Sequence, residues 1–260
     1  MKEYLLIKLG GSLLENRDNR SRAIDTVRVA RQEGTRLVIV HGGGKHIDTA
    51  LARAGIPKKV HVGLRVTDQE TLDIVVSTLC GLLNKTLVAE LNASGIPAVG
   101  LSGADGATLT ADRHPPIQGV DLGFVGSVAG ADPRTIEAIA DLGFVPVIAS
   151  VALGTDGTLL NVNADTAAAA IAVSLRARRL LFFTDVAGLL DDKGRIIESI
   201  STASVQQMLD LNVVRGGIVP KLQSCVSAMA GGVEEIFIAG PDGHYDALLT
   251  GKGGTRLVAA

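Results

Sequence analysis

Residues 4–12 read Tyr-Leu-Leu-Ile-Lys-Leu-Gly-Gly-Ser, and this stretch decides the fold class. Its first six residues are apolar apart from Lys8 and show no alternation of polar and apolar positions, as in a strand that is buried on both faces. Gly10 and Gly11 then end the strand in a turn. A strand of this kind needs helices on both sides, so we expect an α/β protein.

Short apolar runs of the same kind recur along the chain, and helical patterns lie between most of them. Helices that join parallel strands cover both faces of the sheet. The sequence therefore predicts a three-layer α/β/α sandwich with a mainly parallel central sheet, in a single domain over residues 1–260. The other predicted strands are residues 37–40, 98–101, 145–150, 180–184 and 235–239.

Several element boundaries are marked by residue type. Thr67 and Glu70 have the spacing of a capping box, and Pro133 stands where a helix would begin. Residues 108–130 lose the helical period, and glycines punctuate short β-prone pieces, so we expect hairpins inserted at one end of the sheet, where they could form a substrate lid. Glycines that we expect at helix ends are Gly34, Gly95 and Gly143.

The composition excludes several classes of protein. The formal charge is −2, aromatic residues make up 3% and Trp is absent, so no basic stripe or stacking platform for nucleic acid is expected. The residues before Gly10 are too few for a signal peptide, and no apolar run approaches the roughly 18 residues of a membrane span. We expect a cytoplasmic protein without a nucleic acid or membrane partner. Cys80 and Cys225 predict two reduced core thiols, with no disulfide and no structural metal.

The first candidate binding site is Lys8 with the two glycines that follow it. An unpaired ammonium group at the end of a buried strand is costly unless an anion meets it. Gly10 and Gly11 allow backbone N–H groups to approach the same anion closely.

The second candidate is the run His41-Gly42-Gly43-Gly44, which follows a predicted strand. N–H groups at the start of the next helix would favour a negatively charged ligand. For this motif alone, an ordinary tight turn between strand and helix is an equally good interpretation. We interpret His41 as a hydrogen-bonding residue at the strand end, because no partner carboxylate is evident.

Two further segments carry polar groups in positions that suit a ligand. Arg65 stands just before a predicted helix, where its guanidinium fork suits a carboxylate, although a single arginine in a loop is more often a surface residue. Asn161, Asn163 and Asp165 alternate with apolar residues, so in an extended chain all three would face one way. The alternative interpretation is a cluster of helix caps, which could explain Asp165 and one asparagine but hardly all three residues.

The last candidate is Lys221, one residue after Pro220. Pro220 suits a helix start and would place Lys221 in the first turn, where a cation opposes the helix dipole by about 0.3–1 kcal/mol. Lys221 is therefore better explained facing a phosphate. Other phosphate-binding motifs are missing: the Walker pattern fails because Gly253 follows Lys252, and no glycine fingerprint or protein-kinase motif is found.

Together, these segments resemble the amino acid kinase family, because the motifs occur in one order along almost the whole chain. The matching segments are residues 8–11, 41–44, 63–68, 84–85, 102–106, 120–126, 161–165, 185–190, 216–221 and 254–256. The resemblance implies a substrate-binding lobe at about residues 1–175 and an ATP-binding lobe at about 176–260.

The resemblance also implies a role for each matching residue. Lys8 and Lys221 would stabilise the transferring phosphoryl group while Asp165 positions both lysines. The residues implied to bind the substrate N-acetyl-L-glutamate are Gly43, Gly44, Asn161 and Arg65, the last on its α-carboxylate. The residues implied to bind ATP are Gly10, Gly11, Asn163, Asp185, Val186, Ala187, Gly188, Leu189, Leu190, Val213, Val214 and Arg215.

The implied reaction is ATP-dependent phosphorylation of the side-chain carboxylate of N-acetyl-L-glutamate to N-acetyl-L-glutamyl 5-phosphate, the second step of arginine biosynthesis. A carboxylate is a nucleophile at neutral pH, so in-line transfer needs positioning and charge neutralisation but no general base. We expect Mg²⁺ to be bound through the ATP phosphates, and we assign no protein metal ligand.

Two alternatives stay open at this stage. One is a kinase of the same family that acts on aminoadipate or glutamate attached to a carrier protein. The other is a non-catalytic nucleotide or amino-acid sensor, which the presence of Lys8, Asp165 and Lys221 disfavours. The first predicted strand begins at Tyr4 without the preceding helix of arginine-inhibited members, so the resemblance implies a homodimer that is insensitive to arginine.

Overall fold

The fold is described from a computed structural model of the chain. It describes residues 3–32, 34–191, 193–211, 213–214, 217–241, 243, 247 and 252–259, and for Ser12 the backbone alone. Arg215, one of the residues implied to bind ATP, lies outside the described residues.

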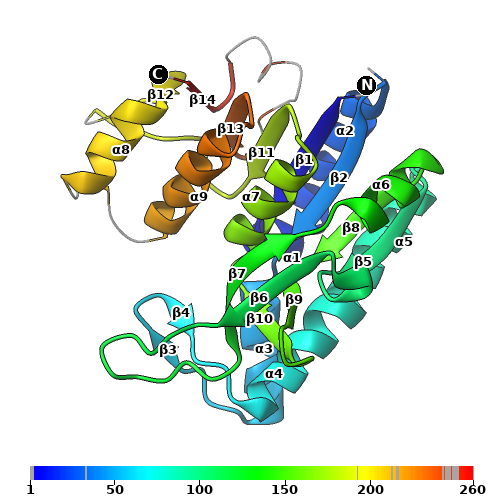
Figure 1. The fold of residues 1–260 in the computed structure, drawn as a ribbon. Coiled ribbons are helices and arrows are strands. Elements are labelled where there is room, and N and C mark those ends of the chain that lie inside the picture. Colours follow the sequence, from blue (N-terminus) through cyan, green and yellow to red (C-terminus); the bar gives the residue numbers. More distant parts are fainter. Residues whose placement is uncertain are drawn as a thin grey trace.

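An eight-stranded sheet forms the centre of the fold, with strand order β12-β14-β13-β11-β1-β2-β8-β5 (Figure 1). All neighbouring strands run parallel except the pair β13 and β14. The mainly parallel sheet and the six predicted strands are confirmed, with shifts of one residue at some boundaries. The strands are β1 (Tyr4–Leu9), β2 (Arg36–His41), β5 (Ala98–Ser102), β8 (Val145–Ala149), β11 (Arg179–Phe183), β12 (Ser199–Ser201), β13 (Glu235–Ala239) and β14 (Thr255–Val258).

Two strands of the sheet were not predicted from the sequence. β12 and β14 contain three and four residues, and polar residues break their apolar pattern. Such short segments carry too few residues for a clear period. They are held by pairing with each other and with β13, which depends on the tertiary fold.

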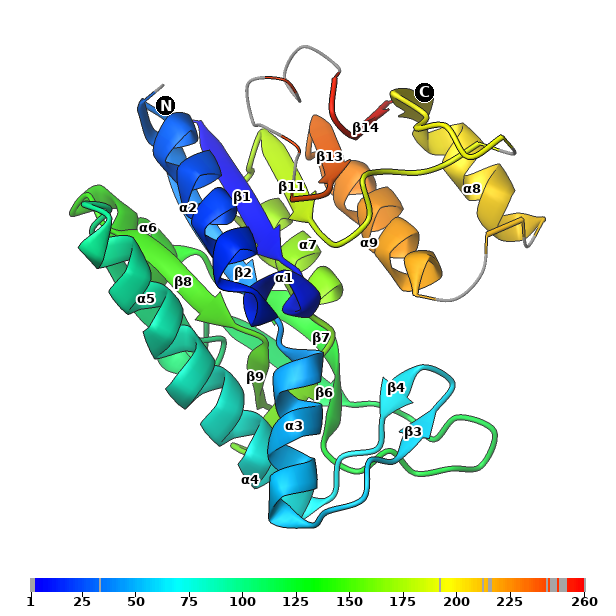
Figure 2. The same ribbon diagram turned by 180° about the vertical axis from the view of Figure 1, so that it is seen from behind.

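Helices cover both faces of the sheet and complete the predicted three layers (Figures 1 and 2). In β1 the side chains of Leu5 and Ile7 enter one core and that of Leu6 enters the other, which explains the absence of polar positions in this strand. The first core contains residues of α1 (Gly11–Glu15), α2 (Arg17–Gln32), α3 (Gly44–Ala54) and α5 (Asn84–Ala93). The second contains residues of α6 (Arg134–Asp141), α7 (Ala164–Ser174), α8 (Thr202–Asp210) and α9 (Ile218–Ala230).

A second, smaller sheet lies beyond the carboxyl ends of β1 and β8 (Figure 2). Its strands β6 (Leu109–Arg113) and β7 (Val125–Ala131) form the predicted antiparallel hairpin. The hairpin is closed into a four-stranded barrel by β9 (Val151–Gly154) and β10 (Leu159–Val162), which the sequence did not predict. A two-stranded hairpin of β3 (Val60–His61) and β4 (Leu64–Arg65) stands beside it, and His61 Nε2 lies 3.0 Å from the carbonyl oxygen of Ile117.

One long helical run packs on the face of the sheet that holds the first core. It comprises α4 (Gln69–Val76), the π-helix η1 (Ser77–Leu83) and α5. The capping-box prediction is wrong: Asp68 caps α4 by accepting a hydrogen bond from Thr71 N, and the Thr67 hydroxyl instead donates to Arg65 O. The run is apolar and long enough to cross a membrane by length and composition alone, but core helices share these properties, and Leu79, Leu83, Leu87 and Leu91 enter the first core.

Other boundaries follow the predictions more closely. Gly34, Gly95 and Gly143 have the positive φ values that suit helix ends. α6 begins at Arg134, one residue after Pro133, and Asp132 Oδ1 accepts a hydrogen bond from Arg134 N. The thiols of Cys80 and Cys225 are both free.

Candidate active site

A cavity of about 230 Å³ opens at the carboxyl ends of the parallel strands, where ligands bind in open α/β sheets. β1 contributes Lys8, and β2 is followed by the glycine turn of residues 42–44. From the barrel side, β10 contributes Asn161. The complete lining is Lys8, Gly11, Gly42, Gly43, Gly44, Ile47, Arg65, Leu79, Ser150, Asn161, Val162, Asn163, Ala164 and Asp165.

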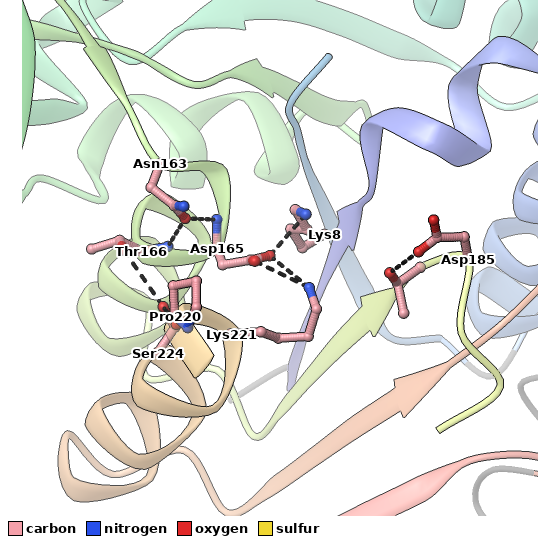
Figure 3. Close-up of polar contacts among 9 residues, drawn as sticks. Lys8, Asn163, Asp165, Thr166, Asp185, Pro220, Lys221 and Ser224 are labelled. Atoms are coloured by element: carbon pink, nitrogen blue, oxygen red, sulfur yellow. Dashed lines mark hydrogen bonds and ion pairs between the residues drawn. The ribbon is translucent and has the colours of Figure 1, made fainter. Parts of the chain in front are cut away.

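Two lysines and one aspartate converge beside this cavity, whose lining includes Lys8 and Asp165 (Figure 3). Lys8 Nζ lies 2.8 Å from Asp165 Oδ1. Lys221 Nζ lies 3.1 Å and 3.0 Å from the two oxygens of the same carboxylate. All three residues are at least nine-tenths buried. The cluster carries two positive charges against one negative charge, so it has one positive charge left for an anion.

Burial and pairing set the protonation of this cluster. Burial lowers the pKa of Lys8 below its ordinary value, and the neighbouring Lys221 adds to the shift, although Asp165 opposes it. Burial alone would raise the pKa of Asp165, but the two ammonium groups together hold it below its ordinary value. Asp165 is therefore ionised at neutral pH and is committed to the two lysines.

Two helix starts place the charged groups. α7 begins at Ala164, so Asp165 stands in the first turn of a helix and not in extended chain as the sequence suggested. The Asn163 side chain caps this helix by accepting hydrogen bonds from Asp165 N (2.8 Å) and Thr166 N (3.2 Å). Asn161 lies on β10 and its amide donates to the Thr67 hydroxyl at 3.2 Å. Of Asn161, Asn163 and Asp165, only Asn163 is therefore a helix cap.

α9 begins at Ile218, two residues before Pro220, so the expected helix start was placed too late. Pro220 is still tolerated because the first N–H groups of a helix have no partner within the helix. Lys221 extends from this helix start toward α7, with its Nζ 5.1 Å from the centre of the Phe182 ring. Ser224 donates to Pro220 O (2.9 Å) and lies 3.5 Å from the Thr166 hydroxyl, which ties α9 to α7 beside the cluster (Figure 3).

Close approach of two turns explains the glycines. A Cβ atom on Gly11 would lie 2.9 Å from Gly44 N and 3.1 Å from Gly43 Cα. A Cβ atom on Gly43 would lie 2.6 Å and 2.7 Å from the Leu83 and Leu79 methyl groups. Only glycine lets the turn after β1 pack directly on the turn after β2.

Arg65 is held at the cavity wall by an acidic partner. Its Nη2 donates to Asp48 Oδ1 at 2.5 Å and to Gly44 O at 3.2 Å. Asp48 also accepts from Lys58 Nζ at 2.7 Å. The Nη1 atom of Arg65 is buried and has no hydrogen-bond partner among the described residues. This nitrogen is available to an anionic group in the cavity.

The segment after β11 follows the strand beside β1, and the Asp185 carboxylate raises the pKa of Lys8 by its charge, against the larger effect of burial. Thr184 donates to Asp185 Oδ1 at 3.0 Å, and Asp185 is drawn separately from the lysines in Figure 3. Gly10 N donates to Phe183 O at 2.8 Å, which ties this segment to the turn after β1. Leu189 is buried in the second core, and its N–H donates to the Thr255 hydroxyl at 2.8 Å. Gly188 is also buried, whereas Val186, Ala187, Leu190 and Val213 are exposed and Val214 is half-buried.

The cavity thus brings together the sequence-predicted residues Lys8, Gly11, Gly43, Gly44, Arg65, Asn161, Asn163 and Asp165. It does not include Gly10, Lys221 or the segments 185–190 and 213–214. Sequence reasoning missed Ser150, Ile47 and Leu79 in the lining and Asp48 behind Arg65. Ser150 ends a predicted strand. Because ligands bind at the carboxyl ends of parallel strands, its position could have indicated a lining residue. Asp48 had none, because its role depends on a contact with β4.

Within the described part of the chain, no group of three His, Cys, Asp or Glu side chains is placed to hold a metal ion. The carboxylate nearest the lysines is already paired with both of them.

Known proteins resemble this chain in sequence. The sequence model of the amino acid kinase family matches residues 3–240. The acetylglutamate kinase of Methanopyrus kandleri is 41% identical over 254 residues, which cover 95% of this chain and 98% of that protein.

Solved structures agree at the level of the fold. The crystal structure of smu.665 from Streptococcus mutans UA159 has a TM-score of 0.85 at 32% identity, with 100% of both chains covered. N-acetylglutamate synthase from Neisseria gonorrhoeae, complexed with coenzyme A and N-acetyl-glutamate, has a TM-score of 0.87 at 26% identity, covering 99% of this chain and 60% of that one. On these grounds, the chain belongs to the amino acid kinase family.

Proposed function

We propose that this protein is an ATP-dependent kinase that phosphorylates the side-chain carboxylate of N-acetyl-L-glutamate to N-acetyl-L-glutamyl 5-phosphate, the second step of arginine biosynthesis. The observation that carries the proposal is the buried pair of lysines on one aspartate, at the end of a cavity whose wall presents Arg65. The similarity to the acetylglutamate kinase of Methanopyrus kandleri supports the choice of substrate.

In the proposed reaction, the acceptor occupies the cavity. The free Nη1 of Arg65 and the Asn161 side chain bind it, with Arg65 on the α-carboxylate, and backbone groups of Gly43 and Gly44 bind it from the other wall. Its side-chain carboxylate then points toward the lysines. Fixing both reactants in line removes most of the entropic cost of bringing them together.

The chemical step is the attack of the acceptor carboxylate oxygen on the γ-phosphorus of ATP, with the bond to the β-phosphate oxygen breaking. Negative charge spreads over the oxygens of the transferring group. Lys8 and Lys221 neutralise this charge, while Asp165 keeps both ammonium groups in place. No proton has to be removed from the acceptor, because a carboxylate is ionised at neutral pH.

ATP would bind on the other side of the lysines, in the lobe of about residues 176–260, and the acceptor in the lobe of about residues 1–175. We assign Gly10, Gly11 and Asn163 to the phosphates and the segments 185–190 and 213–215 to the nucleoside. Mg²⁺ would enter with ATP and neutralise phosphate charge through the phosphate oxygens and water.

The test is a substrate panel. Purified protein with MgATP is given acetylglutamate, free glutamate or carrier-linked aminoadipate, and acyl phosphate is trapped as the hydroxamate. We expect signal with acetylglutamate and little with free glutamate, whose positive amino group replaces the neutral amide. Activity with the carrier-linked substrate alone would contradict the proposed substrate.

We also propose that the protein is a cytoplasmic homodimer. The helical run of α4, η1 and α5 exposes one large apolar side chain on its outer side: Leu82 is 67% exposed, while Leu79, Leu83, Leu87 and Leu91 are buried. Figure 2 shows this run along the outside of the molecule. A second copy of the chain would cover it.

A further inference from the structure

Two buried polar residues lie behind the cavity and take no part in the proposed reaction. His41 at the end of β2 and Asn84 at the start of α5 are both 0% exposed. Asn84 Nδ2 lies 3.1 Å from His41 Nε2, and His41 Nδ1 lies 3.0 Å from Gly42 O. A chain of hydrogen bonds therefore runs from a helix, through a histidine ring, to the glycine turn.

The orientation of the Asn84 amide is fixed by its other neighbours. Its Nδ2 faces the carbonyl oxygens of Val147 at 2.9 Å and Leu101 at 3.3 Å, which can only accept hydrogen bonds. Its Oδ1 faces Lys85 Nζ at 3.2 Å, which can only donate. The amide nitrogen, whose two hydrogens are shared among three acceptors, is thus the group that faces His41.

These contacts select one tautomer of His41. Nε2 faces a donor, so it must be the unprotonated acceptor. Nδ1 faces the carbonyl oxygen of Gly42, so it must carry the proton. Burial lowers the pKa of His41 to about 4, so the ring is neutral at physiological pH and needs this assignment. The contacts of Nε2 and of Nδ1 therefore indicate the same tautomer, with the proton on Nδ1.

The fixed carbonyl group determines where the next N–H group points. The described residues contain no cis peptide bond, so in the unit that joins Gly42 to Gly43 the C=O and N–H point in opposite directions. The Gly42 carbonyl points at a fully buried ring, and both glycines line the cavity. The Gly43 N–H therefore points away from the buried ring, and Gly43 itself lines the cavity.

We propose that His41 and Asn84 are positioning residues that aim the Gly43 N–H at the bound acceptor. This inference rests on the proposed function, in which Gly43 binds acetylglutamate. A donor held in advance costs no reorganisation when the ligand arrives, whereas a free glycine turn would have to be ordered.

The π-helix supports the same interpretation independently. η1 ends at Leu83, directly before Asn84, and Leu79 and Leu83 of η1 are the residues against which Gly43 packs. π-helical segments are rare and often occur at functional sites. Leu79 and Leu83, which pack against Gly43, and Asn84, which contacts His41, therefore lie on one helical run.

A matched pair of variants tests the proposal. In His41→Asn, the amide nitrogen can stand two bonds beyond Cβ, as Nδ1 does, and can still donate to Gly42 O. In His41→Gln, the amide nitrogen stands three bonds beyond Cβ, as Nε2 does. The donor to Gly42 O is therefore lost. We expect His41→Gln to raise the KM for acetylglutamate about tenfold, as loss of one hydrogen bond would, with the KM for ATP unchanged within twofold.

His41→Asn is expected to keep the acetylglutamate KM within about twofold of the wild type. Thermal unfolding of both variants shows whether they are folded. A purely structural role would lower the stability of both without separating their KM values for acetylglutamate, and equal KM values would overturn the proposal.

A second measurement needs neither a variant nor a substrate. Nitrogen-15 NMR of the ligand-free protein, labelled at histidine, distinguishes protonated from unprotonated ring nitrogens. We expect His41 to carry its proton on Nδ1, and a proton on Nε2 would overturn the inference. If the wild-type protein fails to phosphorylate acetylglutamate, the proposed function fails, while this spectrum still decides the assignment of His41.

Discussion

At the scale of single residues, Asp165 is the group on which the site depends most. It is the common partner of two buried ammonium groups that come from opposite ends of the chain. Two buried ammonium groups on the same carboxylate are stable only because they share this counter-ion or bind an anion as well. The excess positive charge that makes the site costly to bury also favours binding of a phosphoryl group.

Replacement of this carboxylate should affect both stability and rate. We expect Asp165→Asn to lower the free energy of unfolding by about 3 kcal/mol, because it leaves two buried cations unpaired. The kcat should fall by about 10²–10³-fold, since the lysines lose their fixed positions. Urea unfolding and steady-state kinetics measure the two effects. The control is Asp141→Asn, which removes an exposed partner of Arg36 and should change little.

The pH dependence of the rate should report Lys8. Because burial lowers the pKa of Lys8 in the ligand-free protein, we expect kcat/KM for ATP to fall on the alkaline side with a midpoint below the ordinary lysine value. Lys8→Arg should be slower, but its residual activity should persist to higher pH, because a guanidinium stays protonated. An alkaline limb at the same pH in both proteins would contradict this assignment.

Stability should change in the opposite direction over the same range. Between the lowered pKa of Lys8 in the folded protein and its ordinary value, the unfolded chain binds more protons. The contribution of Lys8 to the free energy of unfolding therefore rises with pH in this window. Unfolding measured at each pH separates loss of activity by titration from loss by unfolding.

At the scale of elements, the hairpin of β3 and β4 carries the clearest backbone strain. Its two-residue loop is Val62 and Gly63, and both have positive φ values, 46° and 78°. Glycine adopts this conformation freely, but a β-branched residue does not. The hairpin ends in Arg65, so the strain lies next to the cavity wall.

Relief of this strain should be measurable locally. We expect Val62→Asn to stabilise the hairpin by about 1 kcal/mol, because asparagine tolerates the left-handed region. Hydrogen exchange of the Val66 amide, which donates to Lys59 O, should slow about fivefold. Val60→Asn changes an exposed valine in the adjacent strand and should give no such protection. Equal exchange in the two variants would show that the loop is not strained.

At the scale of the whole molecule, the proposed dimer places the outer side of the long helical run, with the exposed Leu82, against a second copy of the chain. We expect light scattering to give twice the chain mass. Leu82→Glu should produce monomers, because it places a charge in the centre of the proposed interface. Leu142→Glu changes a leucine that is 76% exposed elsewhere and should leave the dimer intact. A wild-type monomer, or a dimer in Leu82→Glu, would rule out this interface.

Much of the architecture could be predicted because it depends on local patterns. Tyr4–Leu9 and Glu235–Ala239 were placed at their observed ends, since uninterrupted apolar runs have few alternatives to a buried strand. The barrel was only half foreseen. β9 and β10 are four residues each, and their pairing with β6 and β7 follows from the path of the chain.

By itself, the sequence determined the layered fold, the glycine turns and the choice of Lys8, Asp165 and Lys221 as charged groups in need of partners. Each follows from physics that acts within a few residues: the period of side chains, the freedom of glycine and the cost of burying a charge. The tertiary structure decided the partners. Arg65 pairs with Asp48, and Asn84 selects the tautomer of His41, because strand order and helix packing bring together side chains that no local pattern relates.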